Sequence, residues 1–171
     1  MVLPATAFLS IGSNKGDKVA NLHLAIACLD THPLLQVMAV SRFYKTQPQN
    51  FVDQDWFVNA AVKIHINTED PLVLLAVLKQ IETRMDKQGK PFRFGPRKID
   101  LDIIYFADMV MKTDTLEIPH PRMHERSFVL QPMCDIGAAA VHPVLKMTTR
   151  KLCKKIEKQE NQAVIPLDEE E

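Results

Sequence analysis

The sequence carries no net charge, because its 21 Lys and Arg residues balance its 21 Asp and Glu residues. A protein that binds nucleic acid or an anionic membrane through bulk positive charge is therefore not expected. Long hydrophobic runs are also missing, since no stretch approaches the ~18 consecutive apolar residues that cross a bilayer. The apolar run within residues 1–12 follows no basic region and contains Pro4, so we expect no secretory signal peptide.

The cysteines are too few and too scattered to form a structural framework. Cys28, Cys134 and Cys153 are odd in number and widely spaced, which excludes a disulfide scaffold and a zinc pattern. A reducing compartment, and hence a cytoplasmic location, is expected. At roughly 150 residues per domain, the length of the chain predicts one domain, over residues 1–158. The acidic end, 159–171, is expected to be a flexible tail.

Patterns typical of strands and helices alternate along the chain. Apolar runs and period-two alternation indicate strands, whereas apolar residues three and four positions apart indicate helices. The expected strands are residues 5–11, 35–44, 56–66 and 99–106. The expected helices are 17–30, 71–85, 127–136 with a break near Pro132, and 148–158, and a small hairpin pairs 110–111 with 116–118.

The order strand, helix, strand, strand, helix, strand predicts the fold class. It favours an α+β protein with a ferredoxin-like two-layer sandwich, whose βαββαβ core carries the hairpin and helices at its C-terminal end. A doubly wound parallel sheet is the alternative. It is disfavoured because a loop without a helix joins the second and third strands, as antiparallel pairing requires.

The most informative stretch is Arg93-Phe94-Gly95-Pro96-Arg97-Lys98-Ile99-Asp100-Leu101-Asp102. On a strand, Asp100 and Asp102 project from the same side. Two adjacent carboxylates repel each other and lose solvation unless cations neutralise them. They can mark a hydrated strand end paired with Arg97 or Lys98. Alternatively, carboxylates for Mg²⁺ beside basic residues for phosphate indicate phosphoryl transfer.

Other candidates carry less information. The loop 12–17 follows a strand and precedes a helix, but it lacks the Gly-Lys-Ser/Thr ending of a phosphate loop and is interpreted as a turn. His120 and His124 are four residues apart, yet the prolines around His120 argue against a shared helix and a metal pair. Asn59 and Phe57 share one face of their strand. They indicate either a core amide or a site for a flat heterocycle.

These residues, taken together, resemble a known family. Four segments carry the resemblance: Leu9-Ser10-Ile11-Gly12-Ser13-Asn14, Ser41-Arg42-Phe43-Tyr44-Lys45-Thr46, Asn59-Ala60-Ala61-Val62 and Gly95-Pro96-Arg97-Lys98-Ile99-Asp100-Leu101-Asp102-Ile103. Two shorter segments, 119–123 and 126–130, follow them in the expected order. The sequence resembles the 6-hydroxymethyl-7,8-dihydropterin pyrophosphokinase (HPPK) family of folate biosynthesis. The resemblance implies Mg²⁺-dependent transfer of pyrophosphate from ATP to the hydroxymethyl group of the pterin. No obligate protein partner is expected, and the protein is expected to be a monomer.

The resemblance also implies the residues of the site. Catalytic roles fall to Lys87, Arg97, Asp100 and Asp102, and the two aspartates are implied to hold two Mg²⁺ ions. ATP binding falls to Glu82, Arg93, Arg97, Ile103, Leu116, His120 and Arg126. Pterin binding falls to Thr46, Gln47, Phe57, Asn59 and Phe128, with Asn59 at the hydrogen-bonding edge of the ring and the aromatic side chains against its faces.

The sequence departs from the family pattern after the second helix. Asp86-Lys87-Gln88-Gly89 stands where Gly-Arg-x-Arg is usual, so Lys87 replaces one arginine and Gly89 the other. Because lysine lacks the bidentate fork of arginine, we expect Lys90 to share the phosphate contact. The two polar loops, 45–55 and 86–98, are expected to act as lids over the site.

Two other classes of protein could use the same features. An RNA-binding module shares the expected sheet topology, but it needs paired aromatics on central strands and usually a basic face. The hypothesis of a Mg²⁺-dependent nuclease would be supported by Asp100 and Asp102 alone. Formation of AMP from ATP in the presence of the dihydropterin distinguishes the pyrophosphokinase from both.

Overall fold

The computed structural model describes residues 4–49, 53–159 and 161–168, and it contains the expected elements in the expected order. The strands are β1 (Ala5–Ser13), β2 (Leu35–Val40), β3 (Tyr44–Thr46), β4 (Phe57–Ile66), β5 (Asp100–Phe106), β6 (Met111–Lys112), β7 (Glu117–Ile118) and β8 (Val164–Pro166). The helices are α1 (Lys18–Asp30), α2 (Pro71–Met85), α3 (Ser127–Gly137) and α4 (Thr149–Glu157), with a 3-10 turn, η1, at Met123–Glu125.

The main sheet is antiparallel and has the order β5-β1-β4-β3-β8, and β2 also pairs with β4. One edge of β4 pairs with β1, and its other edge pairs first with β2 and then with β3. All strand pairs of this sheet are antiparallel, which excludes the doubly wound parallel alternative. The predicted hairpin is also present, as the pair β6 and β7.

The single strand predicted over 35–44 is divided into β2 and β3. The register of β2 against β4 shifts between Val37 and Ala39. Ser41 then continues the contact with β4, because its N–H donates to the Ala61 carbonyl at 2.9 Å while its hydroxyl accepts from the Ala61 N–H at 2.8 Å. A side-chain oxygen thus replaces a backbone carbonyl in the ladder, and the strand breaks there.

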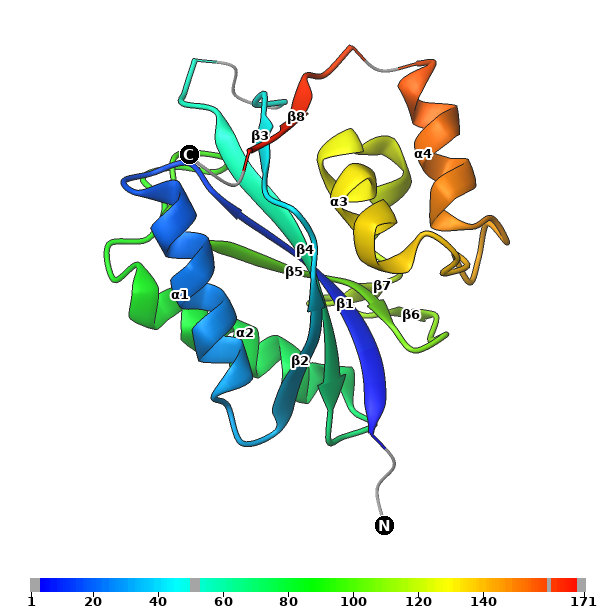
Figure 1. Ribbon diagram of the computed structural model, residues 1–171. Coiled ribbons are helices and arrows are strands. Elements are labelled where there is room, and N and C mark those ends of the chain that lie inside the picture. The colour runs from blue at the N-terminus through cyan, green and yellow to red at the C-terminus, as the bar shows by residue number, and fades with distance from the viewer. Residues whose placement is uncertain (1–3, 50–52, 160, 169–171) are drawn as a thin grey trace.

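Helices α1 and α2 cover one face of the sheet (Figure 1). Each begins at a capping aspartate: Asp17 accepts from the Ala20 N–H at 3.0 Å, and Asp70 accepts from the Leu72 N–H at 2.9 Å with Pro71 at the first turn. Alternate residues of β4 enter the core beneath these helices, as the sequence predicts: Val58, Ala60, Val62 and Ile64. The opposite face of β4 is left for Phe57, Asn59 and Ala61.

Helices α3 and α4 lie on the other face of the sheet (Figure 1). They form a second apolar core with Phe8, Ala61 and Tyr105 from β1, β4 and β5. This second core adds a layer that the two-layer prediction did not include. Helix α3 runs through Pro132 without the expected break. Pro132 is buried, so packing against the sheet compensates for the hydrogen bond that proline cannot donate.

The C-terminal part of the chain differs from its prediction. Residues 164–166 form β8, which pairs with β3. The flexible tail predicted over 159–171 is therefore wrong for these three residues, while 160 and 169–171 lie outside the described residues. A short strand is hard to detect in a sequence because its partner is distant along the chain. None of the helices in the described part of the chain is long and apolar enough to span a membrane.

Candidate active site

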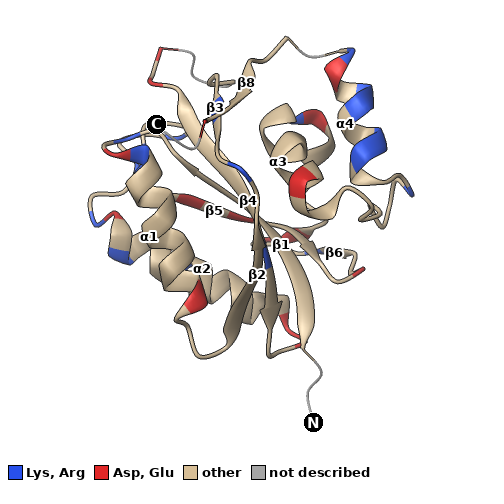
Figure 2. Cartoon of the chain, in the orientation of Figure 1, with Lys and Arg blue, Asp and Glu red and all other residues tan. Residues whose placement is uncertain are grey.

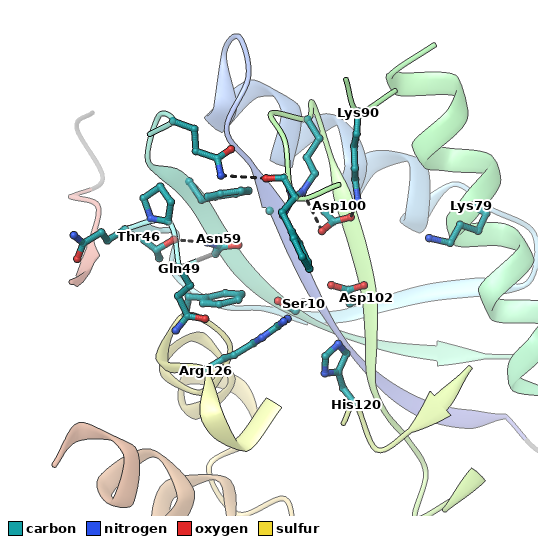
Figure 3. A pocket seen from close by; sticks show the side chains of 18 residues that line it. Ser10, Thr46, Gln49, Asn59, Lys79, Lys90, Asp100, Asp102, His120 and Arg126 are labelled. Atoms are coloured by element: carbon teal, nitrogen blue, oxygen red, sulfur yellow. Dashed lines mark hydrogen bonds and ion pairs between the residues drawn. The ribbon is translucent and has the colours of Figure 1, made fainter. Parts of the chain in front are cut away.

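A cavity of about 290 Å³ opens on the face of the sheet opposite α1 and α2 (Figure 3). Side chains from β1, β3, β4, β5, α2 and α3, from the two polar loops and from the segment after β7 line it. Its lining residues are Ser10, Gly12, Thr46, Gln47, Pro48, Gln49, Gln54, Phe57, Asn59, Lys79, Lys90, Phe94, Arg97, Asp100, Asp102, His120, Arg126 and Phe128. We call Thr46, Gln47, Phe57, Asn59 and Phe128 the amide end, and Lys90, Arg97, Asp100, Asp102, His120 and Arg126 the charged end.

One row of the sheet joins the two ends. Asn59 on β4 lies opposite Gly12 on β1, and Gly12 in turn lies opposite Asp100 on β5. A Cβ added at Gly12 would overlap Oδ1 of Asn59, so only glycine leaves space in this row. Because neighbouring strands are about 4.8 Å apart, Asn59 and Asp100 stand about 10 Å apart across the gap. That span fits a flat ring carrying a short substituent.

Asp100 and Asp102 both face the cavity from β5, as their spacing predicts (Figure 3). In Figure 2, the red colour on β5 marks these acidic residues of the strand. Asp100 forms ion pairs with two basic side chains: Oδ1 lies 3.3 Å from Nζ of Lys90, and Oδ2 lies 3.2 Å from Nε of Arg97. The loop 86–98 thus brings its basic residues to the first aspartate.

Asp102 is in a different environment. It is the next residue after Asp100 on the same face of β5 and lies opposite Ser10 on β1. No side chain in the described ranges forms a hydrogen bond or an ion pair with it. Burial raises the pKa of Asp102 to about 6, and the charges of Asp100 and Glu82 act in the same direction. Arg126 and Lys79 act in the opposite direction, but neither forms an ion pair with Asp102. An enclosed carboxylate without a direct ion pair is suited to receive a cation with the ligand.

Glu82 supports the two aspartates from outside the cavity. Its Oε1 accepts from the Leu101 N–H at 3.0 Å, on the free edge of β5 between Asp100 and Asp102. Its Oε2 lies 3.4 Å from Nζ of Lys79, which lines the cavity. Burial raises the pKa of Glu82. Glu82 therefore fixes the edge of the strand that carries both aspartates.

His120 and Arg126 complete the charged end. Nδ1 of His120 accepts from the Arg122 N–H at 3.1 Å, so in the neutral ring the proton is on Nε2. Burial lowers the pKa of His120 to about 4, and the cations Arg126 and Arg122 act in the same direction. Arg126 extends toward Ser10 (Figure 3), and its buried Nε has no hydrogen-bond partner in the described structure. Both side chains can donate hydrogen bonds to an anion.

The charges of the cavity favour a polyanion. Its lining contains the cations Lys79, Lys90, Arg97 and Arg126 against the carboxylates of Asp100 and Asp102, with His120 neutral. Four positive charges against two negative charges leave an excess of two. In a partly enclosed space, such an excess attracts phosphate groups.

The amide end combines hydrogen-bonding groups with aromatic faces. Nδ2 of Asn59 donates to Oγ1 of Thr46 at 2.5 Å, and both side chains are buried. An arginine lies over each ring: the guanidinium of Arg97 is 4.8 Å from the ring centre of Phe57, and that of Arg126 is 5.5 Å from that of Phe128. This end can read the edge of a flat heterocycle and contact its faces.

Two residues outside the predicted site connect the loops that border it. Oδ1 of Asn14 accepts from the Arg97 N–H at 2.9 Å, and its Nδ2 donates to Oε1 of Gln54 at 2.7 Å. Nε2 of Gln54 donates to the Phe94 carbonyl at 3.1 Å. Through Asn14, the loop 12–17 thus connects the two polar loops. Residues 50–52 of the first loop lie outside the described residues.

The structure places ten of the predicted site residues on the cavity wall: Thr46, Gln47, Phe57, Asn59, Arg97, Asp100, Asp102, His120, Arg126 and Phe128. Five predicted residues are elsewhere. Glu82 lies behind β5, Ile103 and Leu116 are buried in the core under α1 and α2, and Arg93 and Lys87 are exposed on the loop 86–98. The guanidinium of Arg93 lies 4.9 Å from the ring centre of Phe94.

Sequence reasoning missed several residues that line the cavity, including Ser10, Lys79, Phe94 and Gln54. Ser10 could have been found, because it shares the period-two face of Gly12 on its strand. Lys79 is an exposed lysine of an amphipathic helix, and nothing in its neighbourhood along the chain distinguishes it. Gln54 reaches the cavity only through the path of its loop.

Comparison with known proteins shows the family of the chain. Residues 8–138 match the family described as 7,8-dihydro-6-hydroxymethylpterin-pyrophosphokinase (HPPK). The chain belongs to the HPPK family. It is 41% identical over 130 residues to a Bacillus subtilis protein named 2-amino-4-hydroxy-6-hydroxymethyldihydropteridine pyrophosphokinase, a match that covers 76% of this chain and 77% of that protein. It is 43% identical over 145 residues to the folic acid synthesis protein FOL1 of Dictyostelium discoideum, a match that covers 85% of this chain.

The HPPK relatives include much longer proteins. The chain spans 22% of the Dictyostelium FOL1 protein and 37% of a bifunctional protein FolKE of Lactococcus lactis. Among solved structures, Plasmodium falciparum HPPK-DHPS A437G with SDX-DHP has a TM-score of 0.74 at 18% identity, covering 99% of this chain and 48% of that one. That likeness supports the fold.

Proposed function

We propose that the protein transfers pyrophosphate from ATP to the hydroxymethyl oxygen of 6-hydroxymethyl-7,8-dihydropterin and releases AMP, as a step of folate biosynthesis. One observation carries the proposal: a single cavity joins a buried amide with aromatic rings at one end to paired carboxylates with basic side chains at the other. Gly12 leaves the space between them open. A substrate with a flat ring and a short hydroxymethyl arm suits this arrangement.

Asp100 and Asp102 are the residues that fit a divalent cation. Within the described ranges, no group of three His, Cys, Asp or Glu side chains could hold a metal ion, so a bound ion would draw its other ligands from phosphate oxygens and water. No described side chain forms an ion pair with Asp102, which fits this role. Two Mg²⁺ ions, when bound here, would neutralise phosphate charge and align the two reacting oxygens.

The basic residues of the charged end are proposed to bind and orient the triphosphate. Arg97 and Arg126 offer planar donors, and Lys90 offers a mobile point charge. His120 is neutral at pH 7 and donates from Nε2. These groups stabilise charge on the transferring phosphates without accepting a proton, so catalysis rests on position and electrostatics. Lys87 and Arg93, on the exposed loop 86–98, are proposed to join them as the loop closes.

The nucleotide base is proposed to lie near the outer edge of β5, where Glu82, Ile103 and Leu116 are located. Glu82 holds the strand edge there, and Ile103 and Leu116 lie buried in the core beneath it. The pterin is proposed to bind at the amide end, where Asn59 reads its hydrogen-bonding edge between Phe57 and Phe128. Thr46 keeps the Asn59 amide oriented, which reduces the entropy lost on binding.

The core topology supports a ferredoxin-like assignment for the region β1–α1–β2–β4–α2–β5. These four strands have the order β5-β1-β4-β2, with both helices on one face. We infer in addition that the protein acts as a monomer in the cytoplasm. Sedimentation of the purified protein and localisation of a tagged copy test these two inferences.

The reaction is tested by incubating the protein with ATP, Mg²⁺ and the dihydropterin and separating the nucleotides. AMP should appear in equal amount to pterin pyrophosphate, and neither should appear when the pterin is omitted. ADP as the product would indicate transfer of a single phosphoryl group and would contradict the proposal. Cleavage of RNA under the same conditions would favour the nuclease alternative.

A further inference from the structure

Residues 162–167 contact the amide end of the cavity, although they lie beyond residue 138, where the family match ends. Strand β8 pairs with β3, which otherwise would be the edge of the sheet in this region. Leu167 donates from its N–H to the Phe43 carbonyl at 2.8 Å, at the start of the same pairing. A three-residue strand such as β3 has little independent stability, so a second neighbour helps to fix its position.

The contacts concentrate on Gln47, the first residue after β3. Its N–H donates to the Ala163 carbonyl at 3.0 Å, and its own carbonyl accepts from Nε2 of Gln162 at 2.5 Å. Its side-chain Oε1 accepts from the Ala163 N–H at 3.4 Å. Both backbone polar groups and the side chain of Gln47 are therefore bonded to two residues near the C-terminus of the chain.

Gln162 also reaches the next part of the cavity wall. Its Oε1 accepts from Nε2 of Gln49 at 3.2 Å. The amide of Gln162 thus bridges Gln47 and Gln49, and both of these residues line the cavity. Thr46, which orients Asn59, immediately precedes this bridged segment.

We propose that Gln162–Leu167 is a positioning element for the pterin end of the site, with Gln162 as its principal positioning residue. The proposal rests on the proposed function, since it assigns the pterin to the amide end. The segment bonds to the wall of this end and to none of the basic residues or aspartates at the charged end. Its loss should therefore weaken pterin binding while leaving ATP binding unchanged.

The test compares Gln162→Ala and Gln162→Glu with Gln159→Ala in the full-length protein. Gln162→Glu keeps the length and an acceptor for Gln49, but its carboxylate cannot donate to the Gln47 carbonyl. Gln159 is exposed near the end of α4 and serves as the matched control. Calorimetric titration should show the Kd for the pterin raised about 2- to 10-fold in both Gln162 variants, as expected for the hydrogen bond to the Gln47 carbonyl that both lose. The Kd for ATP should stay within about twofold of wild type.

Amide hydrogen exchange of the free protein supplies a second readout that needs no substrate. Exchange at residues 44–47 should be faster in Gln162→Ala than in wild type, while the rest of the sheet and the Gln159→Ala control are unchanged. Equal weakening of both substrates, faster exchange throughout the sheet, or an unchanged Kd for the pterin would overturn the proposal. If the wild-type protein neither bound the pterin nor formed AMP, the proposed function itself would fail, and exchange at residues 44–47 would still report whether the segment holds the loop.

Discussion

At the amide end of the cavity, Asn59 and Thr46 are hydrogen-bonded to each other, whereas at the charged end Asp102 and Nε of Arg126 have no hydrogen-bond partner within the described residues. The amide end is therefore formed before any ligand arrives. The charged end keeps unfavourable desolvation that a metal-bound polyphosphate would relieve. The preorganised amide end suits the selection of a neutral ring. The charged end, with its unsatisfied groups, suits a ligand that brings opposite charges with it.

The largest expected effect comes from the charged end. Asp100→Asn and Asp102→Asn should each lower turnover on the order of 10³-fold, because each removes a carboxylate from the proposed metal pair and several kcal/mol of charge stabilisation. AMP formation at saturating ATP and pterin measures this loss, and circular dichroism checks that the fold is retained. Turnover close to wild type in either variant would contradict the metal assignment.

Asp102→Asn should lower turnover but raise the free energy of unfolding of the metal-free protein at neutral and higher pH. Because burial raises the pKa of Asp102 to about 6 from 3.8, the folded protein binds more protons than the unfolded chain between these values. The contribution of Asp102 is thus most favourable below pH 4 and is lost as pH rises through 6. Urea unfolding of the metal-free protein should show Asp102→Asn more stable than wild type at pH 8. Little difference should remain at pH 4, and a difference independent of pH would contradict this explanation.

At the amide end, Asn59→Ala should weaken pterin binding and leave ATP binding nearly unchanged. Loss of hydrogen bonds in a buried recognition site costs about 1–3 kcal/mol, which corresponds to about 5- to 150-fold in Kd. Titration with each substrate separately measures the two effects. Equal weakening of both substrates, or a large loss of thermal stability, would instead indicate that Asn59 is mainly a core amide.

The smallest expected effect concerns the connection between the polar loops. Gln54→Ala removes the bonds to Asn14 and to the Phe94 carbonyl, and each such bond contributes about 1 kcal/mol. Amide exchange should become faster in residues 92–97 of the free protein, while residues 57–66 stay protected. With ATP and pterin bound together, both loops should regain protection if they act as lids. Unchanged exchange in the variant would show that other contacts hold the loops.

Much of the site could be predicted from short-range patterns. Period-two alternation correctly placed Asp100 and Asp102 on one face of β5, and Phe57 and Asn59 on one face of β4. The predictions failed where partners are distant along the chain. Asn14 and Gln54 are 40 positions apart, and Gln47 and Ala163 are 116 apart. No local pattern in the sequence marks such pairs, because each depends on how whole strands and loops pack.

The sequence by itself determined the helix caps and the alternation of buried and exposed residues, because these follow from local backbone geometry. It also determined which residue types are available to the cavity. Only the tertiary structure decided that Asn59, Gly12 and Asp100 form one row across three strands, and that β8 borders the amide end. The pairing register that creates this row is set by the burial of one whole face of the sheet beneath α1 and α2. A shift of one residue would turn each of these side chains to the opposite face.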